Sequence, residues 1–373
     1  MKTADKMSLA KVNIPAIPSD LVGCHWTEDA IKLVNERYLR KDLNGNHIET
    51  PEGMCWRVSY HIASADKKYG ASEENIIALA RDFYQMMANR EFFPNAPTLY
   101  NAGTGNGLQF SACFVLPIED SMEGIFDSLK WQALVHKSGG GTGFALSNLR
   151  AKNAIVKSTR GKSSGPISFL QIFNAATESV KQGGTRRGAN MAIMRVDHPD
   201  ILEFITCKSV LSEKNKKIFD RIKSSIFSES GLEMLEIGLL ETQVANFNIS
   251  VAATNAFMKA VKDGIEYDLV DPQDGSSVKR LPARMVFDLI VKMAWRTGDP
   301  GLWFIDKTND SPANPIPTLR KIEATNPCGE QPLFNFDVCN LGSIALSRFV
   351  LKNNSSYEVN WEELERVVRL AVH

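Results

Sequence analysis

The sequence predicts an α/β protein whose N-terminal part is helical. Between Thr27 and about Arg90, apolar residues recur at the spacing of amphipathic helices. Beyond this part, short apolar runs alternate with longer helical patterns. Such alternation is typical of a mainly parallel sheet, arranged either as an open sheet or as a barrel.

The helical part has recognisable borders. Residues 1–20 contain three Lys and two Pro among scattered apolar groups, and they predict a loose arm. Ser72 precedes a strongly periodic segment and is followed by two glutamates, so we expect it to cap a helix. Two prolines and a glycine interrupt the segment 92–103, which we interpret as the end of the helical part.

The alternating part yields candidate elements in a regular order. The candidate strands are 111–116, 142–146, 190–196, 246–252 and 302–305. The candidate helices are 121–137, 167–181, 199–208 and 283–296. Residues 209–241 are rich in Lys, Glu and Ser, and they predict a solvated helix or an insertion.

The composition excludes several classes of protein. Of the 373 residues 43% are hydrophobic, which is enough for a sizeable core, and the 43 basic and 43 acidic residues cancel. A chain without an excess of positive charge is poorly suited to bind nucleic acid. No apolar run approaches the roughly 18 residues that cross a membrane. The chain's start lacks the apolar stretch of a signal peptide, so we expect a cytoplasmic protein.

The metal-ligating residue types form no familiar site. The six cysteines include no CxxC pair, and the histidines lack HxH or HxxxH spacing with a carboxylate. We therefore expect no metal site built by the protein. A cysteine with a function would act here as a thiol.

Two glycine-rich segments have structural and functional interpretations. In 136–148 the glycines do not match a dinucleotide or phosphate-loop fingerprint, and tight backbone approach is the favoured interpretation. The segment 182–190, QGGTRRGAN, joins flexible glycines to two arginines. A polar loop and a phosphate-binding or base-binding loop are equally compatible with its residues.

The most informative segment is ATNPCGEQP, residues 324–332. Cys328 lies between a proline and a glycine, on a turned loop that can present a side chain. Glu330 is near enough to act as a base on the same bound group, and Asn326 adds a donor and an acceptor. The chemistry alone leaves a reactive cysteine and an inert one equally open.

Four motifs together resemble a known family. They are SACFVLPIEDS around Cys113, QGGTRRGANM, NPCGEQPL and CNLGSI, in this order along the chain. From about Leu21 onward the chain resembles the large catalytic chain of ribonucleotide reductases, and most closely their adenosylcobalamin-dependent (class II) branch. The resemblance implies a cobalamin cofactor, because NPCGE with both partner cysteines favours that branch.

The resemblance implies a domain plan. It assigns 1–20 to a flexible arm and 21–95 to an N-terminal helical domain. It assigns 96–373 to the first half of a ten-stranded α/β barrel with its central cysteine loop. The second half, with the phosphate-binding loop for substrate, is absent from this sequence, so we expect a split enzyme, a gene fragment or a shortened form.

The resemblance also implies roles in catalysis. Cys328 would carry a thiyl radical that removes the 3′ hydrogen of a ribonucleotide. Glu330 would take the 3′-hydroxyl proton, and Asn326 would bind the ribose hydroxyls. Cys113 and Cys339 would meet in the fold and supply two reducing equivalents as they become a disulfide.

Binding sites follow from the resemblance in the same way. Thr98 and Ser111 match positions near the substrate. The positions that match the binding site for a deoxynucleoside triphosphate effector and its specificity loop are Asp120, Arg150, Gln182, Gly183, Gly184, Arg186 and Arg187. The segment 136–143 then becomes structural.

The implied partners are the ribonucleotide substrate, the effector, a second copy in a homodimer, the absent half-barrel and a dithiol reductant such as thioredoxin. No nucleic acid and no membrane are expected. The alternatives are an oxygen-dependent reductase chain with a small radical-generating subunit, and a nucleotide-binding regulatory module without catalysis.

Overall fold

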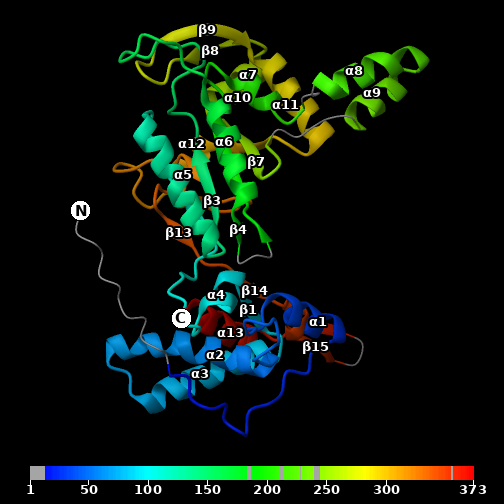
Figure 1. Cartoon of the computed structure of the whole chain (residues 1–373). Coiled ribbons are helices and arrows are strands. Elements are labelled where there is room, and N and C mark those ends of the chain that lie inside the picture. Colours follow the sequence, from blue (N-terminus) through cyan, green and yellow to red (C-terminus); the bar gives the residue numbers. More distant parts are fainter. Residues whose placement is uncertain (1–12, 183–185, 210–212, 227, 239–243, 354–355) are drawn as a thin grey trace. The chain divides into compact units, whose positions relative to one another are not determined.

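A computed structural model of the chain describes residues 13–182, 186–209, 213–226, 228–238, 244–353 and 356–373 (Figure 1). The chain divides into two compact units. The part before Cys113, together with Cys339–His373, forms what we call the helical unit. Cys113–Val338 forms the sheet unit. Each has its own apolar core.

The helical unit is built on an antiparallel helical hairpin that packs against the C-terminal helix. Its helices are α1 (Glu28–Arg37), α2 (Pro51–Ala63), η1 (Ser64–Tyr69), α3 (Glu73–Ala88), α4 (Ala96–Asn101), η3 (Leu346–Phe349) and α13 (Trp361–Val372). Its strands are β1 (Phe92–Pro94), paired with β14 (Gly342–Ile344), and β15 (Val350–Asn353), paired with β16 (Ser356–Val359).

Local chemistry explains where these helices start. The Ser72 hydroxyl accepts a hydrogen bond from the Asn75 amide, which confirms the expected N-cap of α3. The core beneath α2 and α3 includes Trp56 and Tyr84, both almost fully buried. The segment 92–103 is less irregular than its prolines suggested, because Pro97 stands in the first turn of α4, where proline is tolerated.

The sheet unit contains five parallel strands. They lie in the order β10 (Gly301–Phe304), β7 (Phe247–Ala253), β6 (Asn190–Arg195), β3 (Gly141–Ala145) and β2 (Cys113–Val115). All five predicted strands are confirmed. Strands β3 and β6 are buried along almost their whole length, because helices and loops cover both faces of such a sheet.

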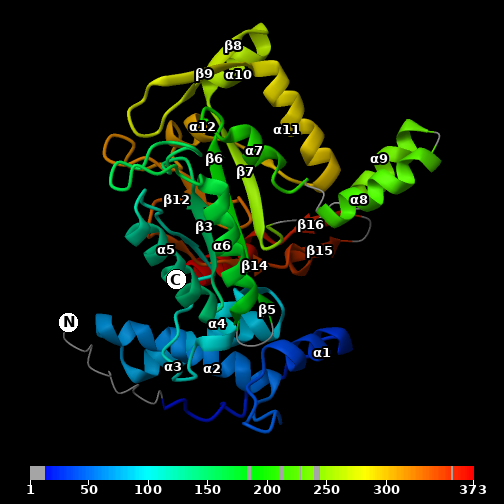
Figure 2. The same cartoon turned by 45° about the horizontal axis from the view of Figure 1, so that its top comes forward.

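Helices connect these strands as the alternation predicted (Figure 2). They are α5 (Met122–Lys137), α6 (Pro166–Ser179), α7 (Ile201–Thr206), α10 (Asn255–Asp263) and α11 (Ala283–Thr297), and α12 (Ile305–Asn309) follows the last strand, β10. Smaller antiparallel pairs are β4 (Lys181–Gln182) with β5 (Arg186–Arg187), β8 (Glu266–Val270) with β9 (Ser277–Pro282), and β11 (Ala324–Thr325) with β12 (Pro332–Leu333). Strand β13 (Val338–Cys339) stands at the boundary of the two units.

Two features of the sheet unit refine the predicted fold. The region 209–241 contains two helices, α8 (Glu213–Ile222) and α9 (Glu229–Gly238), with η2 (Lys223–Ser225) between them, and both views show them extending away from the sheet. A closed or ten-stranded barrel is not observed: within the described residues β10 pairs with β7 alone, so the sheet stays open at that edge. Closing it requires further strands beside β10.

The structure also divides the chain differently from the predicted domain plan. Residues 339–373 group with the helical unit, and that unit continues to Ala112. Of the predicted arm, residues 1–12 lie outside the described part. Pro15 is held on α2, because its carbonyl oxygen accepts a hydrogen bond from the Trp56 indole at 2.8 Å.

Candidate active site

Cys328 lies at the tip of the hairpin formed by β11 and β12. The carbonyl of Asn326 accepts a hydrogen bond from the Gly329 amide at 3.1 Å, which closes a tight turn over Pro327 and Cys328. Gly329 has φ +81°, a conformation that other residues adopt at a cost. The Cys328 side chain is exposed. The turn therefore presents the thiol to solvent, as expected.

Asn326 joins this turn to the start of the sheet. Its side chain is completely buried, and its Nδ2 lies 3.3 Å from the Cys113 Sγ. Its Oδ1 accepts from the Gln331 amide at 3.0 Å, which fixes the orientation of the carboxamide. Two predicted site residues 213 positions apart in the sequence thus share a hydrogen bond.

Glycines in β3 allow the turn to lie against the sheet. A Cβ on Gly143 would stand 1.8 Å from the carbonyl oxygen of Thr325, and one on Gly141 would stand 2.6 Å from Pro327. Neither position has room for a side chain. The glycine-rich segment 136–148 therefore serves close backbone approach, which confirms the favoured interpretation.

Asn248 is a supporting residue that the sequence analysis missed. It lies in β7, and its Nδ2 donates to the carbonyl of Pro327 at 2.8 Å. The turn is thus tied to a second strand. The available signal was an asparagine within a mostly apolar strand.

For the other predicted catalytic residues the structure gives their exposure and the unit to which they belong. Glu330 is exposed and directly follows the turn. Cys339 is partly exposed and belongs to the helical unit, whereas Cys113 belongs to the sheet unit. Their pairing as a disulfide remains a prediction.

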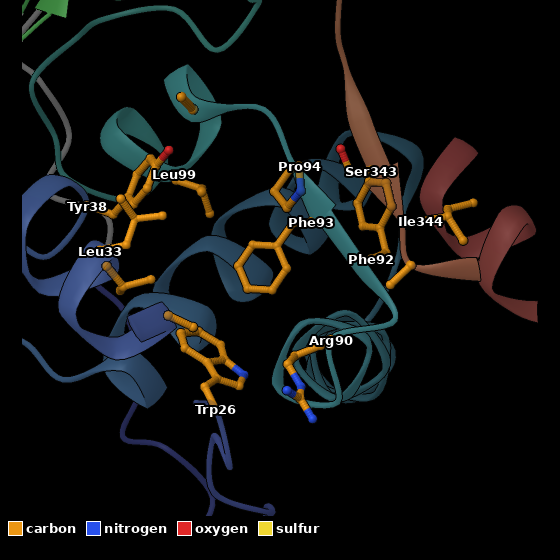
Figure 3. A pocket seen from close by; sticks show the side chains of 14 residues that line it. Trp26, Leu33, Tyr38, Arg90, Phe92, Phe93, Pro94, Leu99, Ser343 and Ile344 are labelled. Carbon is orange, nitrogen blue, oxygen red and sulfur yellow. The ribbon is translucent and has the colours of Figure 1, made fainter. Parts of the chain in front are cut away.

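The predicted substrate residues both lie in the helical unit. The Thr98 hydroxyl donates to the Phe110 carbonyl at 3.2 Å, and Thr98 lines a cavity of about 250 Å³ with Asn95 and Asn340. Ser111 is partly exposed. A second cavity of this unit, about 430 Å³, contains none of the predicted site residues. Figure 3 shows Trp26, Phe93 and Leu99 around it.

The structure brings Asp120 and Arg150 together. The Nε of Arg150 lies 2.9 Å from Oδ2 of Asp120, and the Arg150 amide lies 3.2 Å from Oδ1. Both side chains are about one fifth exposed. Gln273, in the β8–β9 turn, donates from Nε2 to the same carboxylate at 2.8 Å. Both charged residues are predicted nucleotide ligands, whereas their mutual ion pair and the contact with Gln273 have no signal in the sequence.

The predicted specificity loop is described only in part. The backbones of Gln182 and Arg186 pair between β4 and β5, as do those of Lys181 and Arg187. Gly183 and Gly184 lie outside the described residues.

His136 lies at the base of this loop. It lies in the last turn of α5, is almost fully buried, and would stand 2.6 Å from a Cβ on Gly188. Burial lowers the pKa of His136 to about 4, and weaker polar contacts toward Asn190 and Ala189 oppose that shift only in part. His136 therefore packs against the loop as a neutral ring.

This burial predicts a pH dependence of stability. The pKa of His136 is lower in the folded chain than in the unfolded chain. The packing of the neutral ring therefore contributes fully to the free energy of unfolding above pH 6.5, and this contribution is lost as the pH falls toward 4. The loss amounts to about 2–3 kcal/mol of unfolding free energy. Urea unfolding at pH 7, 5.5 and 4.5 should show a shallower pH dependence for His136→Gln than for the wild type. The matched variant His47→Gln, at an exposed histidine, should keep the wild-type dependence. Equal slopes for all three proteins would contradict the assignment.

The described part of the chain contains neither a metal-binding cluster nor a membrane-spanning helix. No three His, Cys, Asp or Glu side chains there are grouped so as to hold a metal ion. None of its helices is both long enough and apolar enough to cross a membrane.

Two protein-family models match the chain. Residues 26–107 match the all-alpha domain of ribonucleotide reductase, and residues 111–373 match its barrel domain. The chain is 39% identical to the vitamin B12-dependent ribonucleoside-diphosphate reductase of Thermoplasma acidophilum, over 92% of this chain and 47% of that protein. The enzyme of the same name from Mycobacterium tuberculosis is 41% identical, over 92% and 44%.

A relative of lower identity carries a different name. The ribonucleoside-diphosphate reductase large subunit of Vaccinia virus is 30% identical, over 86% of this chain and 40% of that protein. The chain thus spans about half the length of the curated relatives that it matches. Because the two family models together cover both units, the chain belongs to the ribonucleotide reductase family.

Proposed function

We propose that the chain is part of the catalytic chain of an adenosylcobalamin-dependent ribonucleotide reductase, which converts ribonucleoside diphosphates to deoxyribonucleoside diphosphates. The observation that carries this proposal is the buried Asn326, which contacts the Cys113 thiol while its own turn exposes Cys328. A turn built only for stability has no need to expose a thiol.

The residues have distinct tasks in this proposal. The Cys328 sulfur, as a thiyl radical, takes the 3′ hydrogen atom of the ribose and later returns it. Glu330 accepts the 3′-hydroxyl proton, and Asn326 orients the ribose hydroxyls. The 2′-hydroxyl leaves as water. Cys113 and Cys339 supply two electrons and two protons as their thiols become one disulfide.

The exposure of Cys328 fits the proposed cofactor. Bound adenosylcobalamin would supply the carbon-centred radical that removes the hydrogen atom from this thiol. A bulky cofactor needs direct access to the sulfur, and the exposed turn offers it, whereas Cys113 and Cys207 are buried. The higher identity to the B12-dependent relatives favours this branch over the oxygen-dependent one. Retention of Asn326, Cys328 and Glu330 argues against a purely regulatory module.

The proposal includes partners. The first is a polypeptide equivalent to the half of the relatives that this chain does not cover. The others are a second copy of the chain and a dithiol reductant such as thioredoxin. We expect no turnover from this chain alone with adenosylcobalamin, a nucleoside diphosphate and dithiothreitol. We expect turnover once the remaining half of a relative is added in trans or fused. Deoxynucleotide formation measured by chromatography is the test. Turnover by the chain alone, or none by a folded and fully associated complex, would overturn the proposal.

A further prediction concerns the effector. We propose that a deoxynucleoside triphosphate binds beside Asp120 and Arg150, where the guanidinium offers paired donors to phosphate. Arg150→Ala should weaken binding by about ten- to a hundredfold, because a charged hydrogen bond contributes about 1.5–3 kcal/mol. The measurement is calorimetric titration of dTTP and dATP.

Matched variants sharpen the effector test. Arg284→Ala removes the same charge from an exposed ion pair in α11 and should leave the affinity unchanged. Gln273→Ala removes a competitor for the Asp120 carboxylate and should not weaken binding. Equal affinity of the wild type and a folded Arg150→Ala for both nucleotides would contradict the site.

A further inference from the structure

Two cysteines outside the candidate active site lie side by side in the helical unit. Cys24 precedes α1 and Cys55 lies within α2, and their Sγ atoms are 3.9 Å apart. Their exposed fractions are 9% and 0%. Neither takes part in the proposed reaction.

Cys24 belongs to a segment that is fastened across α2 and α3. We call residues 15–26 the strap. The strap contains neither helix nor strand. The backbone amide of Cys24 donates to the Glu52 carboxylate in α2 at 3.0 Å. The strap's other contacts are Trp56 with the Pro15 carbonyl at 2.8 Å, Arg81 with Asp20 at 2.8 Å, Tyr84 with the Val22 carbonyl at 2.7 Å and Trp26 with the Ala88 carbonyl at 3.0 Å.

These anchors hold the Cys24 thiol in one place. Hydrogen bonds on both sides of Cys24 restrict the strap, while Cys55 is fixed by the surrounding helix. A disulfide requires the sulfur atoms to approach to about 2.05 Å, so each has to move by roughly 1 Å. We propose that Cys24 and Cys55 form a reversible disulfide that fastens the strap to α2.

The oxidant of this reaction is a peroxide. The Cys24 thiolate, at the less buried position, attacks one peroxide oxygen, the O–O bond breaks, and one water leaves after protonation. The Cys55 sulfur then attacks the resulting sulfenic acid, the S–O bond breaks, and a second water carries away the Cys55 proton. Two thiols thereby lose two electrons, and one hydrogen peroxide becomes two waters. A dithiol reverses the change by exchange.

The surroundings of Cys55 suit the second of these steps. Burial raises the pKa of the Cys55 thiol well above its usual range, and the contact with Cys24 adds to this. Cys55 therefore stays protonated and is a poor first target for peroxide. Cys24 is the less buried residue of the pair, at 9% exposed against 0% for Cys55.

The strap forms part of a cavity wall. Trp26, two residues after Cys24, lines the cavity of about 430 Å³ together with Phe93 and Leu99 (Figure 3). A covalent link at Cys24 fixes the chain next to this wall. It also closes a loop between residues 31 positions apart, which restricts the unfolded chain and stabilises the helical unit.

Peptide mapping tests the bond. The protein used is a variant of the full chain with Cys113→Ser, Cys328→Ser and Cys339→Ser. It keeps three thiols, those of Cys24, Cys55 and Cys207. It is oxidised with hydrogen peroxide, blocked with N-ethylmaleimide and digested with trypsin. We expect peptides 12–32 and 42–57 to appear as one species, two hydrogens lighter than their sum and separated by dithiothreitol. The unsubstituted chain is mapped in parallel, so the result does not depend on the folding of the variant.

Cys207 provides the internal control. It is buried in the sheet unit, and burial raises its pKa to about 12. Recovery of Cys24 and Cys55 as separate maleimide adducts, an over-oxidised Cys24, or equal cross-linking to Cys207 would overturn the proposal.

Stability gives an independent readout. Oxidation should raise the thermal midpoint of the helical unit by a few degrees, and dithiothreitol should return it. Cys24→Ser should show neither change and should form no linked peptide. A linked peptide without any rise in the midpoint would overturn the fastening role of the disulfide. Neither measurement involves turnover, so failure of the proposed function leaves the test valid.

Discussion

Cys328→Ala is expected to abolish ribonucleotide reduction completely in the enzyme completed with the remaining half of its relatives. The variant lacks the sulfur that accepts and returns the 3′ hydrogen atom, and no other described thiol stands on this turn. Nucleotide affinity should change little, because one exposed thiol contributes little binding free energy. Deoxynucleotide yield and exchange of the 3′ hydrogen with solvent are the two measurements.

The control for this prediction is Cys207→Ala. Cys207 is a buried thiol of the same unit and has no place in the candidate site. Its substitution should lower stability, because it leaves a small void in the core, but it should keep turnover. If Cys328→Ala retained 3′-hydrogen exchange, the role of this cysteine as the radical site would be wrong.

Gly143→Ala is expected to disable the site without touching a catalytic residue. The added Cβ would stand 1.8 Å from the Thr325 carbonyl oxygen and 2.9 Å from its carbon. These are backbone atoms of β11, so they cannot rotate away as a side chain could. The hairpin with Cys328 has to move, and with it the contact between Asn326 and Cys113.

The expected size of this effect is large in two measurements. Overpacking of this kind costs about 1–3 kcal/mol of unfolding free energy. A displacement of about 1 Å in a catalytic group costs about a hundredfold in rate. Urea unfolding of the chain and turnover of the completed enzyme measure the two effects separately.

A second glycine of the same unit serves as the control. A Cβ on Gly161 would come no closer than 3.4 Å to its nearest atom, the Thr159 hydroxyl oxygen. Gly161→Ala should therefore change the unfolding free energy by less than about 0.5 kcal/mol. If Gly143→Ala matched Gly161→Ala in stability, the hairpin would not depend on this glycine.

Much of the fold was predictable because its signals are local. Strands β6 and β7 are buried along most of their length, so each reads as a mostly apolar run in the sequence. The cap of α3 needs only Ser72 and the residues directly after it. The position of Cys328 on an exposed turn follows in the same way from Pro327 and Gly329 beside it.

Other features depend on residues far apart in the chain, and only the tertiary structure decided them. Nothing near Asn326 in the sequence indicates that its carboxamide lies 3.3 Å from the sulfur of Cys113. Asp120 and Arg150 each had an interpretation of their own, but packing placed them in contact. The contact of Cys24 with Cys55 has no sequence motif, because it follows from the path of the strap across α2. Periodicity and capping determine which elements form, whereas the meeting of two distant side chains depends on how those elements pack.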